Sequence, residues 1–93
     1  MPIKRITLNG RIIHSLDDFY DQLAPQLHLP DYFGRNLDAL WDVLSTDVEG
    51  AFEITWKHAD DSRKFMGMDF SRALKVLQQL EKARKDFRVI VES

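Results

Sequence analysis

Residues 30–49 form the stretch that most restricts how this 93-residue chain can fold. Apolar residues recur in it at the spacing of one helix face, namely Leu37, Leu40, Trp41 and Leu44. An apolar stripe of this kind has to be buried against another element. The second half of the stretch therefore predicts an amphipathic helix on a core. Gly34 lies where a loop must turn into this helix, and Gly50 follows its expected end.

Acidic side chains set this stretch, the acidic segment (residues 30–49), apart from an ordinary helix. It carries five acids and one base, which gives it a net charge of −4. Asp38 and Asp42 are four residues apart, so they share a face turned away from the apolar stripe. Two like charges at that spacing destabilise a helix by about 0.2–0.5 kcal/mol. A helix selected for stability alone would more often have Lys at position 42.

Three short segments alternate between apolar and polar residues and predict β-strands at residues 3–8, 51–56 and 87–91. Asn9-Gly10 ends the first strand. The same dipeptide could instead mark a tight hairpin, which is less favoured because the following segment is short before the next helix signal.

Helix signals fill the intervals between the strands. Ser15 can accept a hydrogen bond from an orphan amide, so it predicts a helix start, and Pro25 predicts an end or kink near Ala24. Residues 58–67 are polar and predict a loop with at most one helical turn. Asp69 is the expected cap of a last helix. The expected apolar face of that helix consists of Phe70, Ala73, Leu74, Leu77 and Leu80.

The resulting order, β-α-α-β-loop-α-β, predicts an α/β fold with a three-stranded parallel sheet covered by helices. A chain of this length, with 44% hydrophobic residues, is expected to form one domain over residues 1–93. It has no cysteine, no apolar run near the ~20 residues that span a bilayer, and no secretory signal pattern. We therefore expect a cytoplasmic protein without contact to membranes.

Catalytic and metal-binding patterns are absent from the sequence. The three histidines lie in different segments without metal-ligand spacing, and no phosphate-binding loop occurs. Asp38 and Asp42 could act as a general acid and base, but their spacing on an exposed face leaves both carboxylates solvated, whereas catalytic pairs need different environments. The sequence thus predicts no enzyme, no cofactor and no metal site.

Basic residues gather in residues 57–88, the basic region, where nine bases and five acids give a net charge of +4. The bases of the last helix are interrupted by Gln78, Gln79 and Glu81. The whole chain carries a net charge of −2, and no aromatic residues are interleaved with these bases. A solvated helix face explains this pattern better than a nucleic-acid site does.

Two interpretations of the acidic segment stay open on pattern alone. In the first, its aspartates are ordinary surface charge above a core that includes Trp41. In the second, they form a protein-binding face beside Tyr32 and Phe33. Carboxylates accept bidentate hydrogen bonds from arginine as phosphate does, so such a face suits the cleft of a basic nuclease. Binding of that kind should slow as ionic strength rises.

The run Pro-Asp-Tyr-Phe-Gly-Arg-Asn-Leu-Asp-Ala-Leu-Trp-Asp, at residues 30–42, resembles the signature of the barstar family, the intracellular bacterial inhibitors of barnase-type ribonucleases. The resemblance extends over nearly the whole chain, including the Asn9-Gly10 turn and the helix start near Ser15. It implies a barstar-like fold, with a three-stranded parallel sheet and packed helices. It also implies a non-enzymatic inhibitor that is a monomer when free and binds a basic ribonuclease.

The resemblance further implies which residues meet the ribonuclease. Asp42 would enter the catalytic cleft in place of the substrate phosphate, and Asp38 would pair with a base at its rim. The implied partner-binding residues are Tyr32, Phe33, Gly34, Asn36, Asp38, Trp41, Asp42, Ser45, Thr46 and Glu49. The alternative is a barstar-like interaction domain whose partner is not a ribonuclease.

Four positions depart from the best-known member of the family. Phe33 replaces a second tyrosine and Asp47 a tryptophan, whereas Arg35 and Gln79 each replace an acid. Arg35 is expected to weaken the attraction to a basic enzyme. The acidic helix itself is intact, so these departures bear on the identity of the partner, which could be a different ribonuclease or another toxin.

Overall fold

Three parallel strands form the sheet in the computed structural model, which describes residues 3–31 and 33–93. The strands β1 (Lys4–Asn9), β2 (Phe52–Lys57) and β3 (Phe87–Val91) are arranged in the order β1-β2-β3. Ile6 pairs with Ile54, which pairs in turn with Val89. The predicted parallel sheet is confirmed. The hairpin alternative is excluded, because β1 runs into a 3-10 turn, η1 (Gly10–Ile12), and pairs in parallel with β2.

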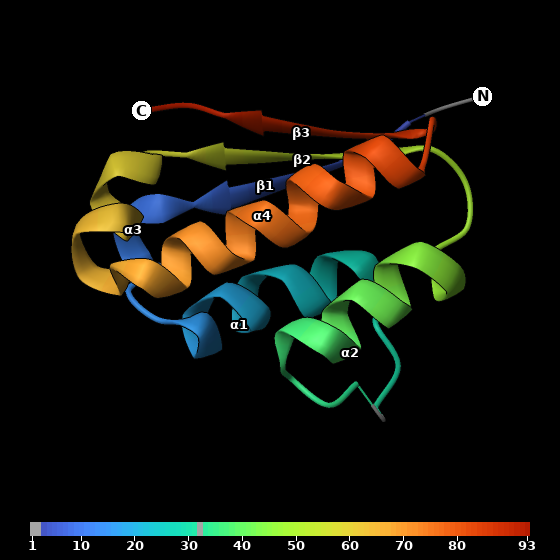
Figure 1. The fold of residues 1–93 in the computed structure, drawn as a ribbon, viewed down its shortest axis with the longest axis horizontal. Helices are drawn as coiled ribbons and strands as arrows, with labels where there is room; N and C mark the ends of the chain where they lie inside the picture. Colours follow the sequence, from blue (N-terminus) through green and yellow to red (C-terminus); the bar gives the residue numbers. More distant parts are fainter. Residues whose placement is uncertain (1–2, 32) are drawn as a thin grey trace.

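Helices cover one side of this sheet (Figure 1). In the figure, α1 (Leu16–Leu27), α2 (Leu37–Asp42) and α4 (Met68–Ala83) lie on that side, and α3 (Ala59–Met66) lies where β2 ends. A π-helical turn, η2 (Val43–Asp47), continues α2. Among the described residues, no helix is long and apolar enough to span a membrane.

The alternation of β2 decides which face of the sheet meets the helices. Phe52, Ile54 and Trp56 are at most 1% exposed, whereas Glu53 and Thr55 are only half-buried on the opposite face. There Glu53 pairs with Arg5 of β1, with 3.1 Å between Nε and Oε1. The apolar stripe predicted for the acidic segment joins the core on the helix side, where Leu40 and Leu44 are fully buried.

Two glutamines of α1 close the outer edge of β1. The Gln26 side chain accepts a hydrogen bond from Thr7 N (3.3 Å) and donates one to Thr7 O (2.9 Å). The Gln22 side chain does the same for Asn9, at 2.8 and 3.3 Å. Gln22 and Gln26 are four residues apart on α1, and this spacing brings them opposite Asn9 and Thr7, which are two residues apart on β1. An edge strand otherwise offers unpaired backbone N–H and C=O groups to other chains. Here the glutamine side chains form hydrogen bonds with those groups of Thr7 and Asn9.

Helix α1 does not end near Ala24, so the end expected there from Pro25 is wrong. Pro25 lies inside the last turn, and the helix runs on to Leu27. His28 then adopts the left-handed conformation (φ 53°), and Leu29 N bonds back to Ala24 O at 3.0 Å. Pro25 has no N–H to donate to Asp21 O, so the helix loses one backbone hydrogen bond there. Burial of Leu27 in the core favours the extra turn.

The loop expected over residues 58–67 is also wrong, because α3 occupies most of it. The buried residues of α3 are Ala59, Ser62 and Met66, which have helical spacing but little apolar character. Ser62 Oγ accepts from Trp56 Nε1 (3.1 Å) and donates to Gly10 O (2.9 Å). A side chain at Gly10 would collide with the backbone of residues 57–58, so the close approach of these two backbone segments requires glycine.

Asp69 is not the cap of α4, contrary to the expectation. The helix begins one residue earlier, after Gly67, which has a positive φ of 56° and supplies the turn between α3 and α4. The Asp69 carboxylate instead pairs with Arg72, at 3.3 Å. The apolar face predicted for α4 is confirmed, with Leu77 and Leu80 fully buried.

Candidate protein-binding surface

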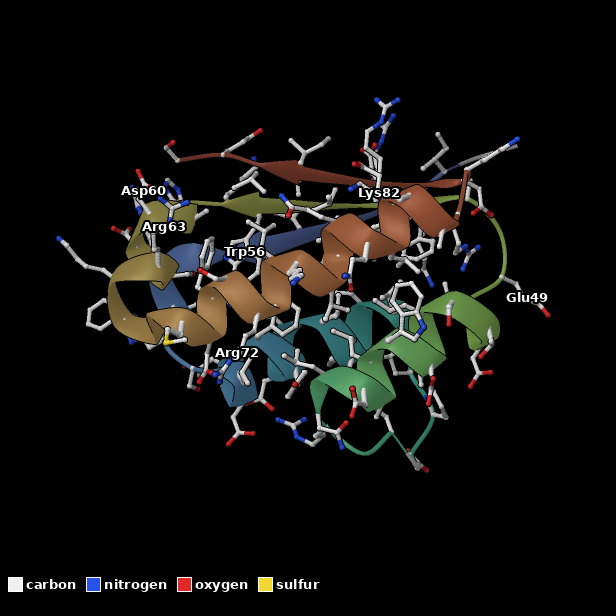
Figure 2. The ribbon with its side chains drawn as sticks, viewed as in Figure 1. Glu49, Trp56, Asp60, Arg63, Arg72 and Lys82 are labelled. Atoms are coloured by element: carbon white, nitrogen blue, oxygen red, sulfur yellow. The ribbon has the colours of Figure 1, made fainter. Side chains whose placement is uncertain are left out.

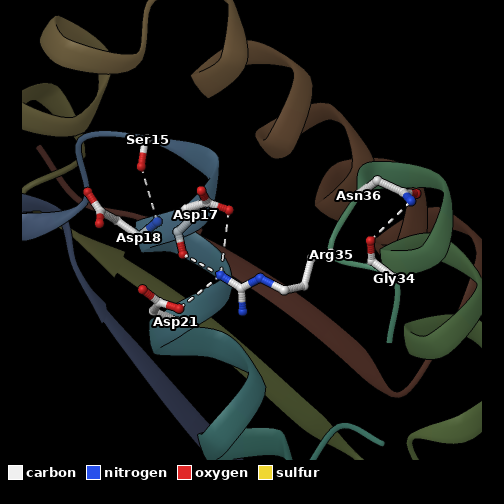
Figure 3. A network of polar contacts seen from close by, with 7 residues as sticks. All are labelled: Ser15, Asp17, Asp18, Asp21, Gly34, Arg35 and Asn36. Atoms are coloured by element: carbon white, nitrogen blue, oxygen red, sulfur yellow. Dashed lines mark hydrogen bonds and ion pairs between the residues drawn. The ribbon is translucent and has the colours of Figure 1, made fainter. Parts of the chain in front are cut away.

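Asn36 fixes the start of α2. Its Oδ1 accepts a hydrogen bond from Ala39 N at 2.8 Å, and its Nδ2 donates to Gly34 O at 3.3 Å (Figure 3). The first contact is an N-cap, which typically stabilises a helix by ~1 kcal/mol. Asp38 follows in the first turn, where a negative charge interacts favourably with the helix dipole. Asn36 thus has a structural role, which its position before Leu37-Asp38 could have revealed.

Arg35, rather than Gly34, makes the turn into α2. It has a positive φ of 50°, whereas Gly34, which lies in the loop before α2 as expected, does not have a positive φ. Its Nη2 atom donates to Asp21 Oδ1 (2.8 Å) and to Asp17 O (3.1 Å), and Asp17 Oδ1 lies 3.6 Å away (Figure 3). The positive charge therefore points at α1 and is balanced there. This arrangement reduces the expected weakening of attraction to a basic partner.

Phe33 forms the floor beneath this loop. Its side chain is only 9% exposed and packs edge-on against the Tyr20 ring, with 5.5 Å between centroids. Tyr20 is itself buried, and its hydroxyl has no hydrogen-bond partner among the described residues. Burial raises the pKa of Tyr20, and the nearby Arg35 charge acts in the opposite direction. Phe33 therefore supports the surface from below more than it adds to it.

Asp38 and Asp42 lie on the exposed face of α2. Within the described part of the chain, neither carboxylate has a base within ion-pair distance. Trp41 between them is half-buried and contacts the core. Two surface hollows, of about 600 and 290 Å³, are lined by residues outside α2. The described residues include no cluster of three or more potential metal ligands. This face offers unpaired carboxylates without an enclosing pocket.

Hydroxyl groups shape the far end of the acidic segment. Ser45 Oγ donates to Trp41 O at 2.6 Å, and Thr46 Oγ1 donates to Asp42 O at 2.5 Å. The backbone closes the π-helical turn through Val48 N and Val43 O, at 3.2 Å. Beyond the turn, the exposed Glu49 points outward at one end of the molecule (Figure 2).

The surface brings together most of the residues implied by the resemblance. One continuous segment carries Gly34, Asn36, Asp38, Trp41, Asp42, Ser45, Thr46 and Glu49. Tyr32 lies outside the described residues. Sequence reasoning missed Arg84, which reaches the end of this segment from beyond α4. A lone arginine among other bases gave no local signal of that contact.

Several arginines of the basic region are paired with nearby acids. Arg63 lies 3.8 Å from Asp60, at the end of the molecule opposite Glu49 (Figure 2). Arg72 and Arg84 likewise have carboxylate partners, at 3.3 and 2.8 Å. These pairs partly neutralise the basic region, which agrees with a solvated helix face.

Comparison with known proteins identifies the family. Residues 3–92 match the family model described as Barstar (barnase inhibitor). The chain is also 35% identical, over 91 residues, to a Bacillus subtilis (strain 168) protein named "Putative ribonuclease inhibitor YrdF". That alignment covers 97% of this chain and 100% of the relative. The chain therefore belongs to the barstar family.

Proposed function

We propose that this protein inhibits a barnase-type ribonuclease by placing the acidic segment in the active site of that enzyme. Family membership and the name of the relative support a role as a ribonuclease inhibitor. The observation that carries the proposal is the exposed pair Asp38 and Asp42, left without an internal base on a helix anchored to the core. We further propose that residues 1–93 act as one domain, without catalytic activity of its own.

Asp42 is the proposed anchor of the complex and Asp38 the second contact. A ribonuclease active site binds phosphate through basic side chains, which a carboxylate can engage with charge-assisted hydrogen bonds. Because Asp38 and Asp42 have no internal ion pair to give up, binding breaks no existing salt bridge. Their shared negative charge should also steer a basic partner during encounter.

The surrounding contacts are proposed to come from both sides of α2. Gly34 and Asn36 lie on the loop side, with Tyr32 assigned there by sequence. Trp41, next to Asp42 in sequence, provides a half-buried aromatic side chain at the border between the core and the exposed face of α2. Ser45, Thr46 and Glu49 are proposed to close the far edge, and Phe33 to support the loop.

The test is titration of a barnase-type ribonuclease with the wild-type protein and with Asp42→Ala. We expect tight inhibition by the wild type and a large loss in Asp42→Ala, whose free energy of unfolding should be unchanged or slightly higher. Asp61→Ala is the matched control, since it removes one exposed aspartate from α3 in the basic region. It should inhibit like the wild type.

Two results would count against this proposal. Unfolding of Asp42→Ala would show that the carboxylate is needed for folding. Absence of inhibition by the folded wild-type protein would favour a partner other than a ribonuclease, to be sought by affinity capture on the wild type with Asp42→Ala as the negative control. Association rates measured at rising salt would show whether charge steers the encounter.

A further inference from the structure

The backbone carbonyl groups at the end of the acidic segment need hydrogen-bond donors from outside the helix. The last carbonyl groups of a helix have no partner within the helix. Here Ser45 and Thr46 hydroxyls and the Val48 amide satisfy the carbonyls of residues 41–43. The next carbonyls are satisfied from a distant part of the chain, because Arg84 donates to Leu44 O and Val48 O, at 2.8 Å each.

Arg84 is well placed to hold this turn. Besides these two contacts, its Nη2 atom donates to Gly50 O at 3.2 Å. Its Nε and Nη2 atoms form a bidentate pair with Asp86, at 2.8 and 2.9 Å, and its guanidinium lies 5.0 Å from the centre of the Phe52 ring. The side chain is only 15% exposed. A planar group held on so many sides has little freedom to reorient.

The positive charge of Arg84 is balanced locally and is largely shielded from solvent. A cation near the end of a helix interacts favourably with the helix dipole. Asp86 balances that cation locally, and little of the Arg84 side chain reaches solvent. The acidic segment is therefore held by an arginine that adds little exposed positive charge to it.

We propose that Arg84 is a positioning residue of the inhibitory surface, a role that rests on the proposed function. Arg84 joins the end of α4 to the turn that carries Ser45 and Thr46 and to the residues just after it, and so fixes that edge relative to Asp38 and Asp42. Without the guanidinium, residues 44–50 lose three hydrogen bonds to the backbone. They would then have to be ordered on binding, which weakens a complex.

The substitution to test is Arg84→Lys, which keeps the charge and loses the planar fork. Arg88→Lys is the matched control, because Arg88 is exposed on β3 and its side chain makes no hydrogen bond or ion pair within the described residues. We expect amide hydrogen exchange at residues 44–50 of the free protein to accelerate roughly tenfold in Arg84→Lys. We expect dissociation from the ribonuclease to accelerate by about the same factor.

The association rate and its salt dependence separate positioning from a general structural role. Both should stay near wild-type values in Arg84→Lys, since Asp38 and Asp42 keep their charge and their anchored helix. Arg88→Lys should match the wild type in every measurement. Should Arg84→Lys fail to fold, Asp86→Asn replaces it, since it retains Arg84 but removes the partner that orients it. A smaller change in the same direction is then expected.

The outcomes distinguish this inference from the proposed function. Faster exchange at residues 44–50 with an unchanged dissociation rate would overturn the positioning role and leave Arg84 as a stabilising contact. Unchanged amide exchange at residues 44–50 would show that Arg84 does not hold this turn. If the wild-type protein binds no barnase-type ribonuclease, the proposed function fails and the positioning role fails with it, while exchange still decides whether Arg84 holds the turn.

Discussion

The acidic segment and the basic region both carry exposed charges on helices, but they place those charges differently. In the basic region, Arg63, Arg72 and Arg84 have carboxylate partners at 3.8, 3.3 and 2.8 Å. On α2, Asp38 and Asp42 have no such partner among the residues described. The one base of the acidic segment, Arg35, is paired with α1 instead.

Lack of a partner does not by itself mark a binding charge, because the lysines of the basic region and Arg88 are also without an ion pair among the described residues. What sets Asp38 and Asp42 apart is that two like charges lie four residues apart on one exposed helix face. An exposed ion pair typically adds 0–1 kcal/mol to the free energy of unfolding, so the paired arginines give the fold small local gains. The α2 carboxylates give no such gain, and they repel each other. A helix keeps such an arrangement at a small cost in stability, which fits charges that act in binding.

The comparison is tested most directly by giving α2 an internal ion pair like those of the basic region. Asp42→Lys places a base four residues after Asp38, so we expect the free energy of unfolding to rise by about 0.5 kcal/mol. Inhibition of the ribonuclease should weaken by about a thousandfold or more, because the new charge repels the basic cleft. Chemical denaturation and an inhibition titration measure the two effects.

The opposite signs of these two effects are the informative part. Lys75→Asp, which introduces an acid on the exposed face of α4, is the converse control and should leave inhibition close to that of the wild type. A less stable Asp42→Lys would mean that Asp42 has a favourable role within the fold. It would contradict the distinction between paired and unpaired charges.

Arg35 is expected to affect stability less, because its side-chain contacts stabilise the fold whereas its positive φ destabilises it. Arg35→Ala removes the contacts to Asp17 and Asp21 but keeps the positive φ, so we expect a loss of about 0.5–1 kcal/mol. Arg35→Gly also removes the contacts but relieves the backbone, and should be more stable than Arg35→Ala by about 1 kcal/mol. Equal free energies of unfolding for the two variants would show that this turn carries no strain.

The smallest expected effect is a dependence on acid pH at Asp86. Hydrogen bonds from Arg84 hold the pKa of Asp86 below its ordinary value. The folded-state pKa is thus lower than the unfolded-state value of about 3.9, and the contribution to stability is fully present above that value. It is lost as pH falls through the folded-state pKa. Denaturation at pH 7 and pH 2 should show that Asp86→Asn destabilises the protein less at the lower pH.

A similar loss at both pH values would contradict this assignment, since it would mean that the carboxylate acts without regard to its ionisation.

Particular residues show why part of the fold could be predicted. The alternation around Ile54 and the helical spacing of Leu37, Leu40 and Leu44 are local patterns, and each correctly predicted an element and its buried side. The failures came where a distant contact outweighed a local preference. Burial of Leu27 favours a helix that continues past Pro25, and Ser62 is buried only because Trp56 and Gly10 supply its hydrogen bonds.

The sequence by itself determined the strand and helix pattern, the acidic character of residues 30–49 and the spacing of Asp38 and Asp42, because periodicity follows from the geometry of a single element. Tertiary structure decided the long-range pairs, such as Arg35 with Asp21 and Arg5 with Glu53, whereas pairs such as Arg72 with Asp69 are local to one helix. Arg84 meets carbonyls 34 to 40 residues away, and Gln22 and Gln26 meet the edge of β1. Such contacts depend on proximity in space, and the order of residues along the chain does not reveal them.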